Sequence, residues 1–286
     1  MSHLVEPNAQ QIQYWNDVVG PKWVALSDLI NSQIEILGHA GMEQAAVKPG
    51  ERVLDVGCGC GQTSLDLAGR VGDSGRVLAV DVSEVMLAEA RERIGEIGHL
   101  EFLEADAQSY EFEEGEFDLI YSRFGVMFFA QPAAAFANLW RALRPGGRMT
   151  FVCWQEPGRN PWMSIPGGAA MQHLEAPPQP DPHAPGPFAF ADAERVRELM
   201  TGAGFSNAVS RSHEADLTLG RGLDLDGVVD FLLQMGPAGS AMREAEEAVR
   251  GAIRESVTAS VEPYMRDEGL VMRAAVWIVN AERAAD

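Results

Sequence analysis

The sequence has few cysteines, no long apolar run and few basic residues. Its three cysteines, Cys58, Cys60 and Cys153, are too few and too irregularly spaced for a disulfide framework, as is typical of proteins from a reducing compartment. No stretch approaches the roughly 18 consecutive apolar residues that a membrane-spanning helix needs, and the first residues lack the pattern of a secretory signal. We therefore expect a cytoplasmic protein that does not insert into membranes.

The shortage of basic residues limits the possible partners. The 22 Lys and Arg residues stand against 42 Asp and Glu residues, which gives a formal net charge of −20. Such a chain repels polyanions on average, and its basic residues form no cluster in the sequence, so we expect no nucleic acid partner. Hydrophobic residues make up 46% of the sequence, as in an ordinary globular protein. The length of 286 residues predicts one large domain, or one domain with an added subdomain. A monomer and a homodimer both remain possible.

Short apolar runs alternate with helical patterns in the middle of the chain. Five runs have the length and composition of buried strands and are bounded by turn residues: 52–56, 76–81, 100–104, 117–124 and 147–154. Three segments between them have apolar residues at helical spacing: 63–71, 83–97 and 132–143. Ser83 is suited to cap the second of these helices, and Pro132 is suited to begin the third. This alternation predicts a mostly parallel sheet with helices on both faces.

The segments on either side of this unit extend it. Residues 8–46 have apolar side chains at steps of three and four, which predicts helical structure. Residues 155–190 carry most of the prolines and are expected to form a long loop with a short helix near 169–174. The further elements expected along the chain are a helix at 192–203, a strand at 205–219, two helices within 224–262 and a strand at 270–279.

The expected organisation is a doubly wound α/β fold with a seven-stranded, mostly parallel sheet. Residues 1–46 would form an N-terminal helical lid, and residues 47–223 would form the ligand-binding core with its proline-rich loop. Residues 224–265 would be an inserted helical cap. Residues 266–286 would then return to the core as the final strand.

A glycine-rich turn follows the first expected strand, in the stretch VLDVGCGCGQTS. Gly57, Gly59 and Gly61 allow a tight turn that brings backbone amides and a helix N-terminus close to a ligand. The dinucleotide fingerprint G-x-G-x-x-G requires a glycine where Gln62 stands. Asp55 at the end of the strand would repel a pyrophosphate but would suit a ligand with an ammonium group. A nicotinamide dinucleotide is therefore disfavoured, although an NAD(P)-dependent oxidoreductase remains an alternative.

Acidic residues also end the next two expected strands. Asp81 stands where a carboxylate can accept hydrogen bonds from both hydroxyls of a ribose. Asp106, in the turn after the third strand, places a carboxylate where an exocyclic amine could be recognised.

The motifs VLDVGCGCG, VLAVDVS, EADA, FDLIYSRFGVMF and LRPGGR, in this order and spacing, resemble those of class I S-adenosylmethionine-dependent methyltransferases. The resemblance is strong over residues 45–155, and beyond them the chain resembles small-molecule methyltransferases of ubiquinone and menaquinone biosynthesis more loosely. It implies transfer of a methyl group by in-line displacement to a small metabolite, with S-adenosylhomocysteine as the product. An oxygen or carbon acceptor is favoured, because the region after the fifth strand is rich in Met, Phe and Pro. A non-catalytic, cofactor-binding regulatory protein is the other alternative.

The resemblance also implies which residues bind the cofactor. The glycine turn would pass beneath its methionine part, Asp81 would hold the ribose, and Asp106 would lie beside adenine. The Tyr14-Trp15-Asn16 triplet resembles the lid segment of such enzymes, although aromatic residues serve equally well in a core. The implied cofactor-binding residues are Tyr14, Trp15, Asp55, Gly57, Cys58, Gly59, Gly61, Asp81, Val82, Met86, Asp106, Ala107, Ser122 and Arg123.

The candidates for catalysis are fewer. His173 and His183 lie in the proline-rich segment, where an imidazole could act as a general base near neutral pH. Arg123 could bind an acidic substrate or pair with a surface acid. Cys58 and Cys60 lack the spacing of zinc ligands and have no histidine nearby, so we expect no metal site.

Overall fold

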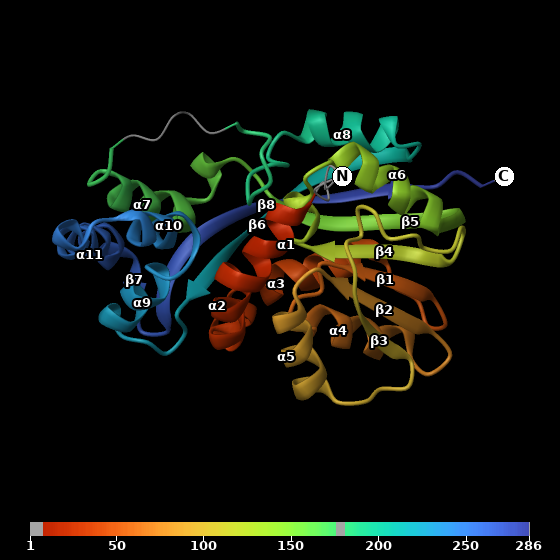
Figure 1. Cartoon of the computed structure of the whole chain (residues 1–286), viewed down its shortest axis with the longest axis horizontal. Helices are drawn as coiled ribbons and strands as arrows, with labels where there is room; N and C mark the ends of the chain where they lie inside the picture. Colours follow the sequence, from red (N-terminus) through yellow and green to blue (C-terminus); the bar gives the residue numbers. More distant parts are fainter. Residues whose placement is uncertain (1–7, 176–180, 286) are drawn as a thin grey trace, which may run out of the picture.

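The apolar runs of the sequence form the strands of one twisted sheet in the computed structural model, which describes residues 8–175 and 181–285 (Figure 1). Within these residues the sheet has eight strands, in the order β3-β2-β1-β4-β5-β8-β6, and β7 pairs with β8. The first five strands are parallel, whereas β8 is antiparallel to both β5 and β6. The strands are β1 (Arg52–Val56), β2 (Arg76–Asp81), β3 (Leu100–Glu104), β4 (Phe117–Arg123), β5 (Leu143–Trp154), β6 (Ser206–Leu219), β7 (Met265–Arg266) and β8 (Gly269–Glu282).

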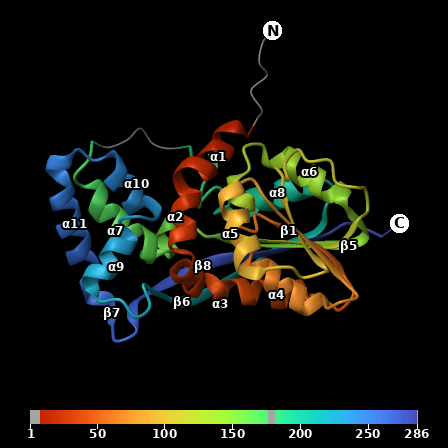
Figure 2. The same cartoon turned by 60° about the horizontal axis from the view of Figure 1, so that its bottom comes forward.

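Helices cover both faces of the sheet, as the strand composition predicts. In Figure 2, α6 (Pro132–Ala142) and α8 (Ala193–Gly202) lie above it, and α3 (Ser27–Ala45) and α4 (Gln62–Val71) lie below. Neighbouring residues of β1 pack into two different hydrophobic clusters. Leu54 belongs to the larger cluster, whereas Val53 belongs to a second cluster that includes residues of α3 and α4. Strands buried on both faces lose the alternation of polar and apolar residues. This explains why the central strands appear as continuous apolar runs.

The N-terminal segment is helical but not one continuous helix. It consists of α1 (Ala9–Tyr14), a π-helical turn η1 (Trp15–Val19), α2 (Gly20–Ala25) and α3. Residues 1–7 of the expected lid lie outside the described residues. Pro21, the second residue of α2, has no amide hydrogen to donate, which accounts for the break in a pattern that periodicity alone predicts to be continuous.

The cap contains more helices than the sequence analysis predicted. The described part of 224–262 forms three helices, not two: α9 (Leu225–Leu232), α10 (Gly236–Glu244) and α11 (Glu247–Val261). The extra break lies where α10 begins, at Gly236, which has a positive φ of 58°. Pro237 follows as the second residue of α10. The short helix expected near 169–174 is instead α7 (Pro161–Met171), which Pro161 begins, while residues 176–180 of this loop lie outside the described residues.

A long ribbon of two strands carries the cap. β6 and β8 pair from Ser206 and Glu282 to Leu219 and Leu270, but β5 pairs with β8 only as far as Val276. The remainder of the ribbon projects beyond the parallel strands, and α7, α9, α10 and α11 surround its end (Figure 1). The cap therefore sits beside the carboxyl end of β5, to one side of the core.

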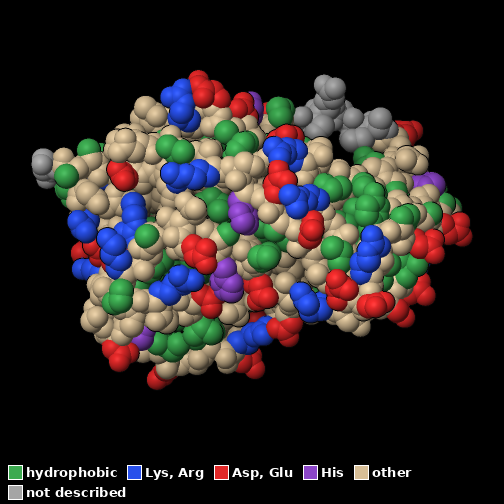
Figure 3. All heavy atoms as spheres, turned by 180° about the vertical axis from the view of Figure 1, so that it is seen from behind, with side chains coloured by type: hydrophobic (Ala, Val, Ile, Leu, Met, Phe, Trp, Pro, Cys, Tyr) green, Lys and Arg blue, Asp and Glu red, His purple; other side chains and the backbone are tan. Residues whose placement is uncertain are grey.

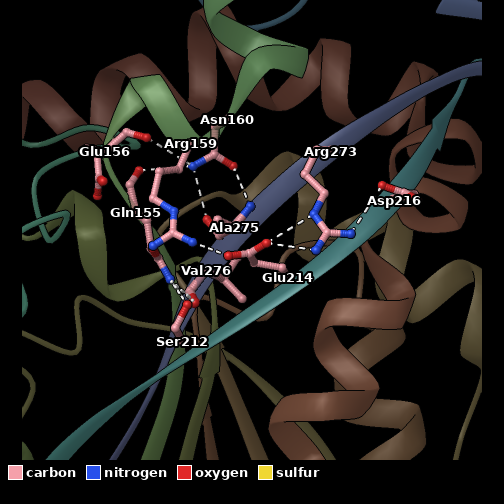
Figure 4. Close-up of polar contacts among 10 residues, drawn as sticks. All are labelled: Gln155, Glu156, Arg159, Asn160, Ser212, Glu214, Asp216, Arg273, Ala275 and Val276. Carbon is pink, nitrogen blue, oxygen red and sulfur yellow. Dashed lines mark hydrogen bonds and ion pairs between the residues drawn. The ribbon is translucent and has the colours of Figure 1, made fainter.

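A buried polar network fixes the point at which the chain leaves β5 for the cap (Figure 4). Asn160, at the start of α7, accepts a hydrogen bond from the Ala275 amide at 3.0 Å and donates to the Ala275 carbonyl at 3.0 Å. Gln155 donates to the Val276 carbonyl and to the Ser212 hydroxyl, both at 2.8 Å. Both amide side chains are fully buried. The side chains of Gln155 and Asn160 thus bind the backbone of β8 beyond the end of β5.

The outer surface mixes charges of both signs. On the face shown in Figure 3, Lys and Arg side chains are scattered among acidic ones and do not gather into one basic patch. None of the helices in the described ranges is long and apolar enough to cross a membrane.

Substitution of Asn160 by Ala should destabilise the fold. The buried Ala275 amide would lose its acceptor, which typically costs about 1–3 kcal/mol. Urea unfolding followed by circular dichroism would measure the loss. Arg273→Ala, which removes only exposed ion pairs of the same region with Glu214 and Asp216, is the matched control and should cost less. Equal losses in the two variants would contradict a structural role for the buried network.

Candidate cofactor and acceptor site

One cavity of about 440 Å³ lies at the carboxyl ends of the parallel strands. Its walls come from the N-terminal helices, the loops after β1 to β4, and the cap. Loops at this edge of an open α/β sheet are where ligands bind. The cavity therefore joins the cofactor residues suggested by the sequence to the cap in a single space.

The glycine turn forms the floor of this cavity. Gly57 and Gly59 line it and have positive φ angles of 70° and 56°. A Cβ on Gly57 would lie 2.7 Å from the Cα of Gly125, so no side chain fits there. Gly61 is not among the described lining residues, because it packs against α5 (Glu84–Ile94), where a Cβ would lie 2.7 Å from Ile94. The first two glycines thus serve ligand access, and the third serves helix packing.

Asp81 connects the glycine turn to the next helix. One carboxylate oxygen accepts a hydrogen bond from the Gly59 amide at 2.8 Å, and the other accepts from the Ser83 amide at 2.9 Å. Burial raises the pKa of Asp81, and the hydrogen bonds from Ser83 and Gly59 act in the opposite direction. Each oxygen keeps a lone pair, and the side chain lines the cavity.

The side chains around Asp106 form an adjoining compartment. Asp106 accepts a hydrogen bond from the Gln108 amide at 2.9 Å, which holds the turn after β3 in place. Ala107, Val82 and Met86 line the cavity with it. A carboxylate among apolar surfaces suits a flat heterocycle that bears an amine.

The N-terminal segment is fastened to the same loop that carries Asp81. Asn16 donates to the Val82 carbonyl at 2.9 Å and accepts from the Glu84 amide at 3.0 Å. The Ser83 hydroxyl donates to the Trp15 carbonyl at 3.0 Å. These contacts fall within the π-helical turn, a feature that often marks functional sites. Tyr14 and Trp15 both line the cavity, so this segment forms one of its walls.

Three of the remaining predicted residues support the site from behind. Asp55 is fully buried, accepts a hydrogen bond from the Ser64 hydroxyl at 2.7 Å, and has a pKa that burial raises to about 7. The Ser122 hydroxyl donates to the Val56 carbonyl at 2.7 Å, and Cys58 is buried beneath the glycine turn. None of the three is among the described lining residues, so the direct contact of Asp55 with an ammonium group has no support in this geometry.

Arg123 differs from these residues because it lines the cavity. Among the described residues, no carboxylate lies within 4.0 Å of its guanidinium group. Burial lowers the pKa of Arg123, while the charges of Tyr121 and Asp55 oppose that shift. A half-buried cation without an ion pair offers a binding site for an anionic group of a ligand.

The two candidate histidines lie away from the cavity. His173 makes a 2.7 Å hydrogen bond with Ser256, which links α7 to α11. His183 is exposed. Among the lining residues that the structure describes there is no histidine. Their role as a general base stays a prediction.

The wall near the cap contains residues that sequence reasoning did not identify, and they come from β5 and α2 as well as from the cap helices. Trp154, Trp162 and Phe231 line the cavity, and the Trp154 ring stacks on Phe124 with 4.2 Å between ring centroids. Lys22 and Arg243 line it as well. The sequence indicated that the cap helices roof a pocket, but helical spacing alone does not separate cavity-facing residues from core residues.

The comparisons with known proteins agree with this geometry. Residues 53–147 match the family described as "Methyltransferase domain". A curated relative from Ectopseudomonas mendocina, "Ubiquinone/menaquinone biosynthesis C-methyltransferase UbiE", is 31% identical over 150 residues, which cover 51% of this chain and 58% of the relative. The chain thus matches little more than half the length of this relative.

Solved structures extend the likeness beyond the matched domain. The [4+2]-cyclase SpnF has a TM-score of 0.55 and is 20% identical, and the alignment covers 94% of this chain and 96% of the cyclase. A phosphoethanolamine N-methyltransferase from Haemonchus contortus was solved in complex with phosphomonomethylethanolamine and S-adenosylhomocysteine. Its TM-score is 0.51 and its identity 19%, and the alignment covers 87% of this chain and 52% of the methyltransferase. At these identities the likeness is one of fold. Residues 53–147 are thus similar to a methyltransferase domain, and the chain shares the fold of these solved structures.

Proposed function

We propose that the protein transfers a methyl group from S-adenosylmethionine to a small-molecule acceptor. The observation that carries this proposal is the single cavity, which joins the glycine turn and the acids Asp81 and Asp106 to an aromatic compartment beneath the cap. A donor and an acceptor bound in one enclosed space can meet in the orientation that the reaction requires.

The residues present fit this cofactor. The turn at Gly57 and Gly59 has room for a chain to pass close to the backbone, and Asp81 has lone pairs for the two hydroxyls of a ribose. Asp106, with Val82 and Met86, suits adenine. Arg123, at the end of β4, lines the same cavity and would bind the carboxylate of the methionine part.

The chain contributes mainly alignment and exclusion of water. The cofactor, when bound, supplies a methyl group on a sulfonium that needs little further activation. The glycine turn and Asp81 hold the donor side, and Trp154, Trp162 and Phe231 hold the acceptor side. The segment at Trp15 separates the space from solvent. Together these contacts favour in-line geometry and a dry site.

An acceptor that is already nucleophilic suits this site. The lining residues in the described part of the chain include no histidine, and their two aspartates are committed to the cofactor end. An oxygen or carbon acceptor remains part of the proposal, because the acceptor compartment is apolar. The two alternatives, an NAD(P)-dependent oxidoreductase and a non-catalytic regulatory protein, gain no support from the related proteins described above.

Replacement of Asp81 by Asn tests the cofactor assignment. The amide removes the negative charge that would face the ribose, which weakens two charge-assisted hydrogen bonds. Affinity for S-adenosylhomocysteine should therefore fall roughly tenfold or more. Isothermal titration calorimetry measures this, with NADH titrated in parallel to test the oxidoreductase alternative.

Asp118→Asn is the matched control, because Asp118 is also a hydrogen-bonded acid but lies at the opposite end of β4 and pairs with Arg144. Its affinity for S-adenosylhomocysteine should be unchanged. Unchanged affinity in the Asp81 variant, or tighter binding of NADH, would refute the assignment.

Replacement of Asn16 by Ala tests the lid. The two side-chain hydrogen bonds of Asn16, to the Val82 carbonyl and from the Glu84 amide, would be lost. S-adenosylhomocysteine should then dissociate several times faster, since the lid opens more readily. Stopped-flow tryptophan fluorescence measures the rate, and Gln13→Ala, on the exposed side of α1, is the control. An unaltered dissociation rate would show that this contact does not retain the cofactor.

A further inference from the structure

Two cations face the acceptor compartment from different parts of the chain. Lys22 comes from α2 in the N-terminal segment, and Arg243 comes from α10 in the cap. Both line the cavity. α2 lies between the cap and the rest of the core (Figures 1 and 2), so the two side chains come from separate elements.

Neither cation has an acidic partner within the described residues. No carboxylate oxygen there lies within 4.0 Å of the Lys22 amine or of the Arg243 guanidinium. The polar contact of the Arg243 side chain is a 2.8 Å hydrogen bond to the Ser240 hydroxyl.

The arrangement has an electrostatic cost. Burial lowers the pKa of Lys22, and the positive charge of Arg243 lowers it further, so the two groups are near enough to repel each other. Bringing like charges together is unfavourable unless a counterion lies between them. An anion in the cavity would remove this repulsion and gain two charge-assisted hydrogen bonds.

The cofactor leaves this position free. Its methionine carboxylate belongs at the glycine turn, where Arg123 is available. Its ribose and adenine belong with Asp81 and Asp106. The surface beside Arg243 is instead that of the cap, because α10 packs against α7 and α9, the helices that carry Trp162 and Phe231. The anion is therefore part of the acceptor, and the rest of that molecule contacts aromatic surface.

We propose that Lys22 and Arg243 form an anion clamp, which selects an aromatic or otherwise hydrophobic acceptor that carries an oxyanion, either a carboxylate or a phosphate. This inference rests on the proposed function, since it names the class of acceptor for the same cavity. An anion held by both residues would also link α2 to α10 and draw the two walls together over the acceptor.

The test is binding of matched ligands to the full chain saturated with S-adenosylhomocysteine, measured by isothermal titration calorimetry. The ligands are 2-naphthoate, 2-naphthyl phosphate and the neutral 2-naphthamide, together with dodecanoate and dodecanamide as an aliphatic pair. At least one anion should bind tenfold or more tightly than its amide. Preference for naphthoate or for naphthyl phosphate distinguishes a carboxylate from a phosphate acceptor.

The variants Lys22→Gln and Arg243→Gln should each reduce that preference at least fivefold, and should leave affinity for the amide and for S-adenosylhomocysteine unchanged. Arg221→Gln is the matched control, because Arg221 is exposed and is not among the described lining residues. This variant should keep the preference for the anion over the amide. A change in net charge alone would then not account for the effect of the Lys22 and Arg243 variants.

Three results would overturn the proposal: equal binding of anion and amide, failure of every anion to bind, or loss of S-adenosylhomocysteine affinity in the Lys22 or Arg243 variant. The last result would assign these cations to the cofactor. The proposed function has its own separate test, because it fails if the wild-type chain does not bind S-adenosylhomocysteine. The two failures are therefore distinguishable.

Discussion

The hydrogen bonds of the Asp81 carboxylate hold the donor half of the site together. One oxygen fixes the Gly59 amide in the glycine turn, and the other fixes the Ser83 amide at the start of α5. The N-terminal segment is attached to the same loop through Asn16 and Trp15. A single buried acid thus lies where the turn, the start of the helix and the N-terminal segment meet. The desolvation that raises its pKa is offset by these fixed amide donors.

Much of this half of the protein could be predicted from the sequence. β1, β2 and β3 have the bounds expected from their apolar runs, because buried parallel strands leave a strong local signal. Glycine turns and acids at strand ends are also local features. Of the predicted cofactor residues, those that line the cavity are Tyr14, Trp15, Gly57, Gly59, Asp81, Val82, Met86, Asp106, Ala107 and Arg123.

The acceptor half could not be predicted in the same way. Lys22 and Arg243 are far apart in the sequence, and nothing near either one indicates that both face the same space. Asp55 illustrates a different problem, since its position in the motif does not reveal that its side chain points towards α4 and Ser64. Asn160 is similar, because its two bonds to Ala275 join residues that are distant in the chain. Such contacts depend on tertiary packing and leave no periodic pattern.

The projecting ribbon of β6 and β8 has a consequence for how such a protein could diversify. The cap helices surround the part of the ribbon that lies beyond β5, while the loops proposed to bind the methyl donor all follow β1 to β4. Insertions or exchanges in the cap would reshape the proposed acceptor compartment without displacing a strand of the parallel sheet. Descendants of one ancestral gene could therefore acquire new acceptors by remodelling the cap, while the loops proposed to hold the donor are inherited unaltered.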